Sequence, residues 1–487
     1  MFKRVFSNKI LIITIVILSA LILLLVGILF FIELPSINNS SNNLNNNKAS
    51  SNVNENINTE TPSETDSSYL SPFGAMEAGV GYVPIRKGGT PSFKEAAEMG
   101  VKWSRAAISD FTGDTEKDYN FEINDRIFKS ANDAGILNYV YNINVAQFAR
   151  GNHTWMPKAE LVNQYINWVK YVVEYYDGDG NNDMPDLKYP VKYWQIDNEP
   201  DVNLELSDTP STYADLLKIS YEAIKEADPD AKVLCGGISQ HQEFYYQVFE
   251  KYHPQRYFDI FDYHYYGMVT GDYRNFEKGV NKIKAYFNEK GWPEVSIWST
   301  EMGSYSGEPP GLPFQSETQQ AGDYVKRWVH GISVNVPVIF GAWWLKENWL
   351  DPFDSVFHHT GLIFNGQYGN DRGENVKKIG YYSYQVMAEK LEGLIFQEMT
   401  ELADDAFSYR FLNTSTGKST YVVWWDGYQE GTSKSIDFSG INGSTIRITD
   451  AITDYNGNRT TNLMNIQGGN VSLQLEAYHP LFIEVAE

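Results

Sequence analysis

The stretch of sequence that decides the fold is residues 193–200, which read Tyr193-Trp194-Gln195-Ile196-Asp197-Asn198-Glu199-Pro200. A short apolar run that stops at a polar turn predicts a buried β-strand. Residues 296–303 repeat the pattern as Ser296-Ile297-Trp298-Ser299-Thr300-Glu301-Met302-Gly303. Most glutamates lie on solvated helix faces, so a glutamate directly after a buried strand is unusual. The two glutamates would meet at one edge if their strands belong to one parallel sheet.

Short β-type runs alternate with helical periodicity on both sides of these stretches, over residues 71–392. The predicted strands are Phe73–Met76, Val101–Ala107, Ile136–Ile143, Val191–Ile196, Lys232–Gly236, Phe258–Tyr263, Val295–Ser299 and Val338–Trp344. The predicted helices are Ser92–Met99, Ile123–Ala134, Ala159–Tyr176, Tyr213–Ala227, Glu243–Tyr252, Phe276–Asn288, Glu317–Val334 and Val376–Glu392. This alternation favours an α/β fold of the (β/α)8 TIM barrel type, whose active site lies at the C-terminal ends of the strands. A doubly wound open sheet is the alternative, but no Gly-rich phosphate turn follows the first predicted strand.

The helical periodicity disappears after residue 393, and short alternating segments take its place. They are Ser408–Leu412, Thr420–Trp425, Ser435–Phe438, Thr445–Thr449 and Ser472–Leu475, separated by Gly, Asn and Asp turns. The pattern predicts a C-terminal β-sandwich domain over residues 393–487. Two roles are open for it: a companion that packs against the barrel and stabilises it, or an independent sugar-binding module.

The chain begins with a different kind of segment. Residues 10–32 are almost entirely apolar, and about 20 such residues are enough to cross the hydrocarbon core of a membrane as a helix. Basic residues precede this segment, so the positive-inside rule places residues 1–9 in the cytoplasm and the rest of the chain outside the cell. A cleavable signal peptide is the competing interpretation, but Leu34-Pro35-Ser36 offers no small-x-small cleavage site. Residues 33–70, rich in Asn and Ser, are predicted to be a disordered linker.

Composition limits the classes of function. The chain has 487 residues, with 39 Lys and Arg against 62 Asp and Glu, which gives a net charge of −23. Such an acidic chain is a poor partner for nucleic acid, because phosphate recognition depends on clustered basic side chains. The only cysteine is Cys235, which excludes an intrachain disulfide framework. Aromatic residues make up 15% of the chain, more than an ordinary core needs.

The two strand-end glutamates have the chemistry of a glycosidase pair. Cleavage of a glycosidic bond needs one carboxylic acid that protonates the departing oxygen. It also needs a carboxylate on the other side of the sugar, which acts as nucleophile or as base toward water. Glu199 and Glu301 would supply this pair from the fourth and seventh predicted strands.

The surrounding residues carry a resemblance to a known group. Asn198-Glu199-Pro200 and Glu301-x-Gly303 resemble the motifs of glycoside hydrolase clan A, and most closely those of the cellulase-type family five. The sixth predicted strand adds Asp262-Tyr263-His264-Tyr265-Tyr266-Gly267, which is similar to the His-x-Tyr segment of that family. Trp343-Trp344 ends the eighth strand, where the family keeps a sugar-stacking tryptophan, and Arg105 matches its strand-two arginine.

The resemblance implies a retaining mechanism. Glu301 would attack the anomeric carbon, and Glu199 would act first as acid and then as base. The resemblance also implies that Asn198 binds the sugar 2-hydroxyl group, and that Arg105 and Tyr266 orient Glu301 by donating hydrogen bonds.

Three further residues complete the predicted substrate site. The resemblance implies that His264 lines the site, and a structural role for this histidine is the alternative. Trp344 would be the stacking platform, with Trp343 behind it, because adjacent residues of a strand face opposite ways.

An acidic loop precedes the fourth predicted strand. Asp177, Asp179, Asn181 and Asp183 place oxygen-bearing side chains at every second position, as in loops that wrap a calcium ion. The loop departs from an EF-hand, because position six is Asn182 and position twelve is Lys188. A structural calcium site and a solvated acidic turn are both open interpretations, and no cofactor is expected to be required for catalysis.

Together these observations predict a retaining glycoside hydrolase that cleaves β-glycosidic bonds in poly- or oligosaccharides. It would be anchored in the membrane by one N-terminal helix and displayed outside the cell. The alternatives are a non-catalytic surface glycan-binding protein and a transglycosylase that remodels cell-surface glycan. The expected partners are a carbohydrate and the membrane, and no nucleic acid.

Overall fold

The computed structural model describes residues 70–76, 78–80, 91–108, 121–149, 154–202, 209–239, 242–341, 344–347, 355–367 and 371–486. The chain divides into two units, Met1–Leu70 and Ser71–Glu487, and apart from Leu70 the described residues belong to the second. The predicted membrane segment at residues 10–32 therefore lies outside the described residues. Among the residues that are described, no helix has both the length and the apolar character needed to span a bilayer.

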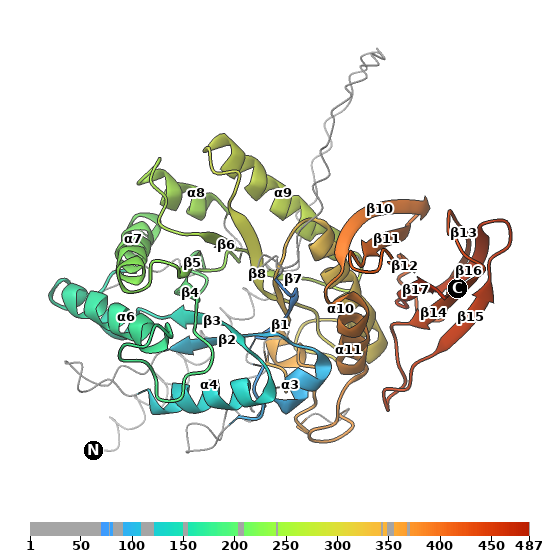
Figure 1. The fold of residues 1–487 in the computed structure, drawn as a ribbon, viewed down its shortest axis with the longest axis horizontal. Helices are drawn as coiled ribbons and strands as arrows, with labels where there is room; N and C mark the ends of the chain where they lie inside the picture. Colours follow the sequence, from blue (N-terminus) through green and yellow to red (C-terminus); the bar gives the residue numbers. More distant parts are fainter. Residues whose placement is uncertain are drawn as a thin grey trace, which may run out of the picture. The chain divides into compact units, whose positions relative to one another are not determined.

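A closed ring of parallel strands forms the centre of the second unit (Figure 1). The strands are β1 (Phe73–Met76), β2 (Trp103–Ile108), β3 (Asn138–Ile143), β4 (Tyr193–Ile196), β5 (Lys232–Cys235), β6 (Ile260–Asp262), β8 (Ser296–Gly303) and β9 (Ile339–Gly341). Each strand pairs with its neighbour in parallel, and the β1–β9 and β6–β8 pairings close the ring. A two-residue strand, β7 (Tyr265–Tyr266), continues beyond β6 and pairs with the end of β8. The predicted (β/α)8 barrel is confirmed.

Helices cover the outside of the barrel. They are α3 (Lys94–Met99), α4 (Glu122–Ala134), α6 (Val162–Tyr176), α7 (Thr209–Ala227), α8 (Gln242–Glu250), α9 (Tyr273–Glu289), α10 (Glu317–Ser333) and α11 (Ile379–Leu391). The shorter elements α5 (Ala146–Ala149), η2 (Ala159–Leu161) and η3 (Val356–His359) lie in the loops. Local sequence fixes the helix ends: Ser316 and Gln319 form a capping box at the start of α10, and Gly100 ends α3 with a φ of 96°.

Two antiparallel sheets follow the barrel in sequence. The larger has the order β10 (Ile395–Ala403), β11 (Ala406–Leu412), β12 (Ser419–Trp425), β17 (Leu481–Val485), β14 (Thr445–Asp450) and β15 (Thr461–Asn465). The smaller pairs β13 (Ser433–Ser439) with β16 (Asn470–Glu476). The five predicted segments all lie in strands, whereas β10, β15 and β17 were not predicted.

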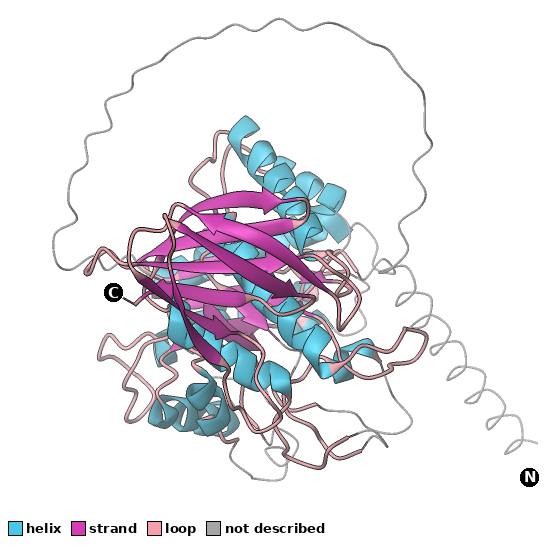
Figure 2. Ribbon diagram, turned by 90° about the vertical axis from the view of Figure 1, so that its right-hand side faces the viewer, coloured by secondary structure: helices cyan, strands magenta, loops and turns pink. Residues whose placement is uncertain are grey.

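The strands β11, β12 and β17 of the larger sheet are buried on both faces. Val422 and Trp424 of β12 belong to the barrel-side core, whereas Val423 between them packs toward β13 and β16. Alternate residues of a strand point to opposite faces, so the same strand serves both cores. Figure 2 shows these strands in magenta with the barrel helices behind them. The packing favours a companion role for the sandwich over an independent module.

Buried charge also joins the sandwich to the barrel. The Asp426 carboxylate at the end of β12 accepts hydrogen bonds from Tyr273 (2.6 Å), Arg274 (2.7 Å) and Lys326 (3.1 Å), which lie on α9 and α10. Asp426 and Lys326 are almost fully buried. Two positive charges and one hydroxyl donor therefore compensate one buried carboxylate, which makes this contact specific as well as close.

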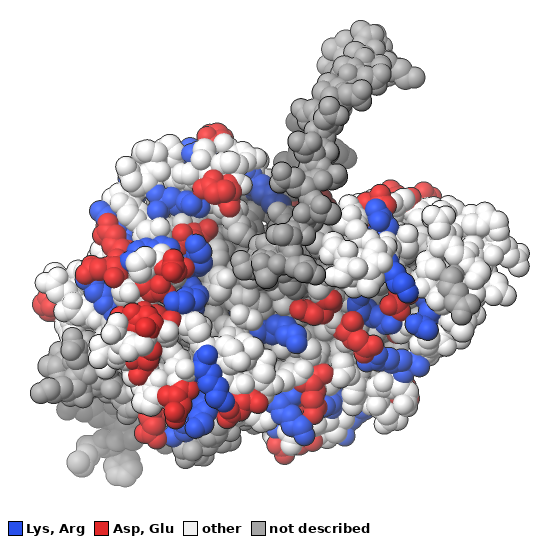
Figure 3. Space-filling model, in the orientation of Figure 1, with Lys and Arg blue, Asp and Glu red and all other residues white. Residues whose placement is uncertain are grey.

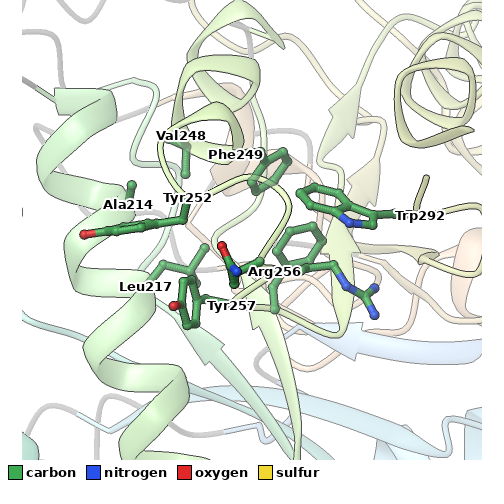
Figure 4. Close-up of a pocket in the computed structure, with 10 residues that line it drawn as sticks. Ala214, Leu217, Val248, Phe249, Tyr252, Arg256, Tyr257 and Trp292 are labelled. Atoms are coloured by element: carbon green, nitrogen blue, oxygen red, sulfur yellow. The ribbon is translucent and has the colours of Figure 1, made fainter. Parts of the chain in front are cut away.

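The end of the barrel opposite the two glutamates is densely packed. A cavity of about 10 Å³ lies there between α7 and α8, lined by Leu217, Phe249, Tyr252 and Trp292 (Figure 4). This space is about that of one water molecule, so no sugar ring could enter it. The aromatic rings in this region fill core, and they account for part of the high aromatic content.

Candidate active site

The loop after β4 presents Glu199 in an unusual backbone conformation. Asp197 and Glu199 both have positive φ angles, 60° and 45°, which non-glycine residues rarely adopt. Hydrogen bonds hold the turn: the Asp197 carboxylate accepts from the Val145 amide (3.1 Å) and the Asn198 amide (2.8 Å). The Asn142 side chain donates to the Asp197 carbonyl at 2.6 Å. Strain at a position so firmly held is typical of functional sites.

Glu301 lies inside β8, which continues past the predicted end at Ser299 to Gly303. Ser299 pairs with Ile339 and Met302 with Gly341, and the register shifts between them. Such a bulge bends the strand and re-aims a side chain, here at Thr300 and Glu301. The Glu301 carboxylate consequently reaches the site while remaining fully buried.

The surroundings of Glu301 suit an ionised carboxylate. Its Oε1 accepts a hydrogen bond from Arg105 Nη1 at 2.6 Å, and its Oε2 accepts one from the Tyr266 hydroxyl at 3.1 Å. Burial raises the pKa of Glu301 above its usual value, and the neighbouring positive charges of His264 and Arg105 offset part of this increase. Arg105 and Tyr266 thus take the positions that the resemblance implied for them.

Glu199 lies across from Glu301 and is the more accessible of the two. Its side chain is 20% exposed, whereas that of Glu301 is inaccessible. A carboxylate oxygen of each residue and one ring nitrogen of His264 lie within 4.8 Å of one another. The structure therefore brings the carboxyl groups of the two predicted catalytic residues close together.

Arg105 also orients Asn198. Its Nη2 donates to Asn198 Oδ1 at 2.5 Å, and its Nε donates to Gln195 Oε1 at 2.7 Å. Since the oxygen of the Asn198 amide accepts from Arg105, the amide NH₂ group is the end available to donate to a ligand hydroxyl. This orientation suits the predicted contact with a sugar.

His264 is part of the site but is nearly inaccessible, with 1% of its side chain exposed. Its Nδ1 lies 2.8 Å from Glu199 Oε1 and 3.6 Å from Glu301 Oε2. Burial lowers the pKa of His264, but Glu301 and Asp262 outweigh this effect and raise it to about 10. His264 therefore acts on the carboxylates and presents almost no surface to a substrate.

Further aromatic rings lie next to Tyr266, and we use the name aromatic wall for Tyr266, Phe357, His358 and Trp344. The Phe357 ring meets the Tyr266 ring edge-on at 5.1 Å, and Trp344 stacks on His358 at 6.0 Å and 17°. The predicted platform Trp344 is half-buried. Trp343 lies outside the described residues.

Sequence reasoning missed several members of this site. Phe357 and His358 come from η3, and no motif distinguished that segment. Asp262 was quoted within the sixth-strand motif without a role, although its spacing of two from His264 indicates a common face. Gln195 similarly lies two positions before Asp197 on the strand that leads to Glu199.

The acidic loop forms a cluster that differs from the predicted set. Ligand oxygens of Glu174, Asp177 and Asp179 lie within 4.8 Å of one another. The Asp183 carboxylate instead accepts from the amides of Gly178 (3.2 Å) and Gly180 (2.9 Å). The Asn181 side chain donates to Asp179 Oδ2 at 3.1 Å. The structure thus gathers two of the four predicted residues with Glu174, and calcium binding stays a prediction.

Comparisons with known proteins give a fold likeness. No family model matches the sequence, and no curated protein matches it. A glucosidase from Croceicoccus marinus has a TM-score of 0.59 at 15% identity, covering 85% of this chain and 95% of its own. A GH30 endoxylanase from Clostridium papyrosolvens has a TM-score of 0.57 at 15% identity, covering 86% and 97%.

A GH51 α-L-arabinofuranosidase from Thermotoga petrophila gives a similar result, with a TM-score of 0.60 at 13% identity, covering 86% and 98%. At such identities the likeness shows the fold. Families 30, 39 and 51 among the similar structures are clan A families, so the likeness to the clan fold is confirmed, and the assignment to family five is not.

Proposed function

We propose that this protein is a retaining glycoside hydrolase that cleaves β-glycosidic bonds by double displacement. The observation that carries the proposal is the position of Glu199 in the loop after β4 and of Glu301 within the last residues of β8, with carboxylate oxygens within 4.8 Å of each other. Retaining enzymes keep their two carboxyl groups about 5–5.5 Å apart, whereas inverting enzymes need about 6.5–9.5 Å to admit a water molecule. The close spacing supports retention.

The environments of the two carboxylates support different roles. Glu301, buried and held by Arg105 and Tyr266, is oriented to attack the anomeric carbon and form a glycosyl ester. Glu199, which solvent can reach, protonates the leaving oxygen and then takes a proton from the water that releases the sugar. Asn198 donates to the sugar hydroxyl next to the anomeric carbon, a contact that strengthens in the transition state.

One feature of the site favours an enzyme over a non-catalytic glycan-binding protein. A binding site needs the aromatic wall, but it does not need an ionised glutamate held in a water-free position. Burying a carboxylate is costly unless charged partners compensate it. The cost of burying the Arg105–Glu301 ion pair is therefore explained by a catalytic role for Glu301, and sugar stacking alone does not explain it.

The substrate class is proposed as a β-linked glycan. The similar structures include a glucosidase and an endoxylanase, and sugar rings pack their C–H faces on aromatic rings like those of the wall. Product analysis on β-glucan, mannan, xylan and aryl glycosides identifies the glycan and the cleavage pattern. The same products reveal any transfer to a sugar hydroxyl, which is the transglycosylase outcome.

The test of the mechanism follows the stereochemistry of the first product. Proton NMR during hydrolysis of an aryl β-glycoside should show the β-anomer first, with the α-anomer appearing only by mutarotation. Glu301→Gln should abolish turnover while sugar binding is retained. Glu199→Ala should keep activity only on substrates with good leaving groups, and azide should rescue it by attacking the glycosyl ester. Initial formation of the α-anomer would overturn the retaining mechanism.

We also propose that the enzyme is anchored in the membrane with its barrel outside the cell. The support is the apolar segment at residues 10–32, the basic residues before it and the polar residues 33–70 after it. Membrane fractionation of the full chain tests the anchor, and protease treatment of intact cells tests the side. Release of activity into the medium as a shortened chain would favour a cleaved signal peptide.

A further inference from the structure

A buried pair, Asp262 and His264, lies directly behind Glu199. His264 Nε2 is 3.2 Å from Asp262 Oδ2 and 3.0 Å from Thr300 Oγ1. All three side chains are buried, with Asp262 and Thr300 completely inaccessible. The glycosidase roles proposed above do not use Asp262, although burying a carboxylate there is costly.

The hydrogen bonds around Asp262 settle which nitrogen of His264 carries a fixed proton. Asp262 Oδ1 accepts from the Thr300 amide at 2.9 Å, and Oδ2 accepts from the Thr300 hydroxyl and from Gln195 Nε2, each at 2.5 Å. A carboxylate surrounded by donors is acceptor-only. The Thr300 hydroxyl donates its single proton to Asp262, so it can only accept a hydrogen bond from His264. The proton between them therefore belongs to His264 Nε2.

The other ring nitrogen faces both catalytic carboxylates. Nδ1 lies 2.8 Å from Glu199 Oε1 and 3.6 Å from Glu301 Oε2. With Nε2 already protonated, a second proton can be held on Nδ1 as imidazolium, or on Glu199 as a carboxylic acid that donates to Nδ1. Both arrangements contain the same number of protons, and they differ by a shift along one hydrogen bond.

We propose that Glu199 and His264 hold the catalytic proton in common, and that Asp262 is the positioning residue that keeps the imidazole in place for this exchange. The proposal rests on the proposed function and goes beyond it, because it makes the proton donor a pair of residues. In it, His264 serves the acid/base step and does not bind the sugar.

The proton that the pair gives up in the first step is regained in the second. In the first, the Glu301 oxygen bonds to the anomeric carbon, the glycosidic C–O bond breaks, and the proton of the pair passes through Glu199 to the leaving oxygen. The pair is then a Glu199 carboxylate and a neutral His264. In the second, a water oxygen bonds to the anomeric carbon and the bond to Glu301 breaks. The proton of that water returns to the pair through Glu199.

The backbone leaves only one place for the imidazole. A Cβ atom on Gly237 would lie 2.0 Å from His264 Nε2, which is impossible without moving the ring. Gly237 follows β5, so β5, β6 and β8 together confine His264. Glycine is required here because the ring packs directly on the backbone.

The charges around His264 predict the direction of a pH effect. Glu199 faces it from the loop after β4, Glu301 from β8 and Asp262 from β6, and Arg105 of β2 reaches Glu301. The negative charge of Asp262 raises the pKa of His264 and so keeps the proton in the pair. Without that charge the pair should lose its proton at a lower pH. The alkaline limb of the kcat/KM profile reports deprotonation of the catalytic acid, so it should then move to lower pH.

The test compares Asp262→Asn with Thr300→Val. Asp262→Asn should move the alkaline limb down by about one pH unit or more. It should also lower kcat/KM about 100-fold on glycosides with poor leaving groups, with a change below about threefold on dinitrophenyl glycosides, which need no acid. Thr300→Val keeps the negative charge of Asp262. It should therefore lower activity, through the lost hydrogen bonds, without moving the alkaline limb. Equal pH profiles for wild type and Asp262→Asn, with both proteins folded by circular dichroism, would overturn the proposal.

A second pair of measurements does not depend on how Asp262→Asn folds. Gly237→Ala keeps every charge but displaces the ring, and it should show the same dependence on the leaving group as Asp262→Asn. In the wild-type protein, ¹⁵N NMR of labelled histidine, assigned with His264→Gln, should show His264 protonated on both nitrogens near neutral pH. A neutral ring protonated only on Nδ1 would refute the shared proton. If the wild type cleaves no glycoside, the proposed function fails, while this NMR result still decides the proton arrangement.

Discussion

Arg105 Nη1 lies 2.6 Å from Glu301 Oε1 at a place where both side chains are almost inaccessible to water. The same guanidinium also binds Gln195 and Asn198, so one residue of β2 sets the position of groups on β4 and β8. A planar guanidinium can do this because its donors lie in a fixed fork. The Glu301 carboxylate, the Asn198 amide and the side chain of Gln195 are therefore coupled through a single side chain.

Removing the Arg105 charge should affect both the rate and its pH dependence. Arg105 lowers the pKa of Glu301 against the effect of burial, so Arg105→Gln should raise that pKa further. Since Glu301 must be ionised to attack, the acid limb of kcat/KM should move to higher pH. Loss of the contact should also lower kcat about 100-fold or more.

Arg105→Lys is the matched variant, because it keeps the positive charge and loses the planar guanidinium with its several donors. It should leave the acid limb nearly in place but still lower kcat through the lost contacts to Gln195 and Asn198. Arg126→Lys changes a solvent-exposed ion pair with Glu122 and serves as the neutral control. Identical acid limbs for wild type and Arg105→Gln would show that the arginine does not control ionisation of Glu301.

Tyr266→Phe should lower kcat about 10- to 100-fold, the usual effect of losing a hydrogen bond to a charged group. The variant removes the 3.1 Å contact to Glu301 and keeps the ring against Phe357. Burial and the nearby Glu301 charge raise the pKa of Tyr266 well above its usual range, so the hydroxyl remains a donor at all working pH values. Above the acid limb the loss should therefore stay constant up to pH 9. The acid limb itself should move to higher pH, because the ionised form of Glu301 loses a hydrogen-bond donor. Wild-type activity in Tyr266→Phe would contradict this role.

Asp426→Ala should destabilise the joint between barrel and sandwich by about 3–5 kcal/mol, because it leaves the buried Lys326 charge without its partner. Arg274 and Tyr273 lose the same acceptor. Urea unfolding followed by tryptophan fluorescence measures the change. Asp133→Asn, which breaks an exposed pair with Lys188, should stay within about 0.5 kcal/mol of wild type. Similar values for the two variants would mean that the buried cluster adds no stability.

The barrel was predictable because its signals are local. Each predicted barrel strand overlaps an observed one, since strands buried on both faces read as short apolar runs. The same property hid β17, where Phe482 packs toward the barrel and Ile483 toward the sandwich, so no alternation is visible. Strand β15 was missed for the opposite reason, because most of its residues are exposed.

The site was predictable only where a residue belongs to a strand-end motif. Glu199, Glu301, Arg105 and Tyr266 do, and the structure gathers them. Phe357 does not: it reaches Tyr266 from η3, more than 90 positions along the chain, through a loop whose path no periodicity encodes. The bulge at Thr300 and Glu301 was also invisible, because it depends on how β8 pairs with β9.

Calcium should raise the melting temperature of the protein by about 2 °C or more at pH 8, through Glu174, Asp177 and Asp179. Burial raises the pKa of Asp177 to about 6, and a carboxyl group must lose its proton to bind the ion. The response should therefore be much smaller at pH 5 than at pH 8. Asp179→Asn should abolish it, whereas Asp186→Asn, on the same loop but outside the cluster, should not. Equal melting temperatures with calcium and with chelator at pH 8 would show that this loop binds no calcium.

Trp344→Ala should raise KM about tenfold or more with a smaller effect on kcat, because the ring is expected to stack on the sugar and takes no part in proton transfer. His358 stacks on Trp344 at 6.0 Å, so protein supports one face of the indole. His358→Ala removes the support without removing the platform and should raise KM by a smaller factor. Trp344→Phe keeps an aromatic face and should recover part of the affinity. If Trp344→Ala lowered kcat with KM unchanged, the residue would be acting on the carboxylates, and the sugar platform would have to lie elsewhere on the aromatic wall.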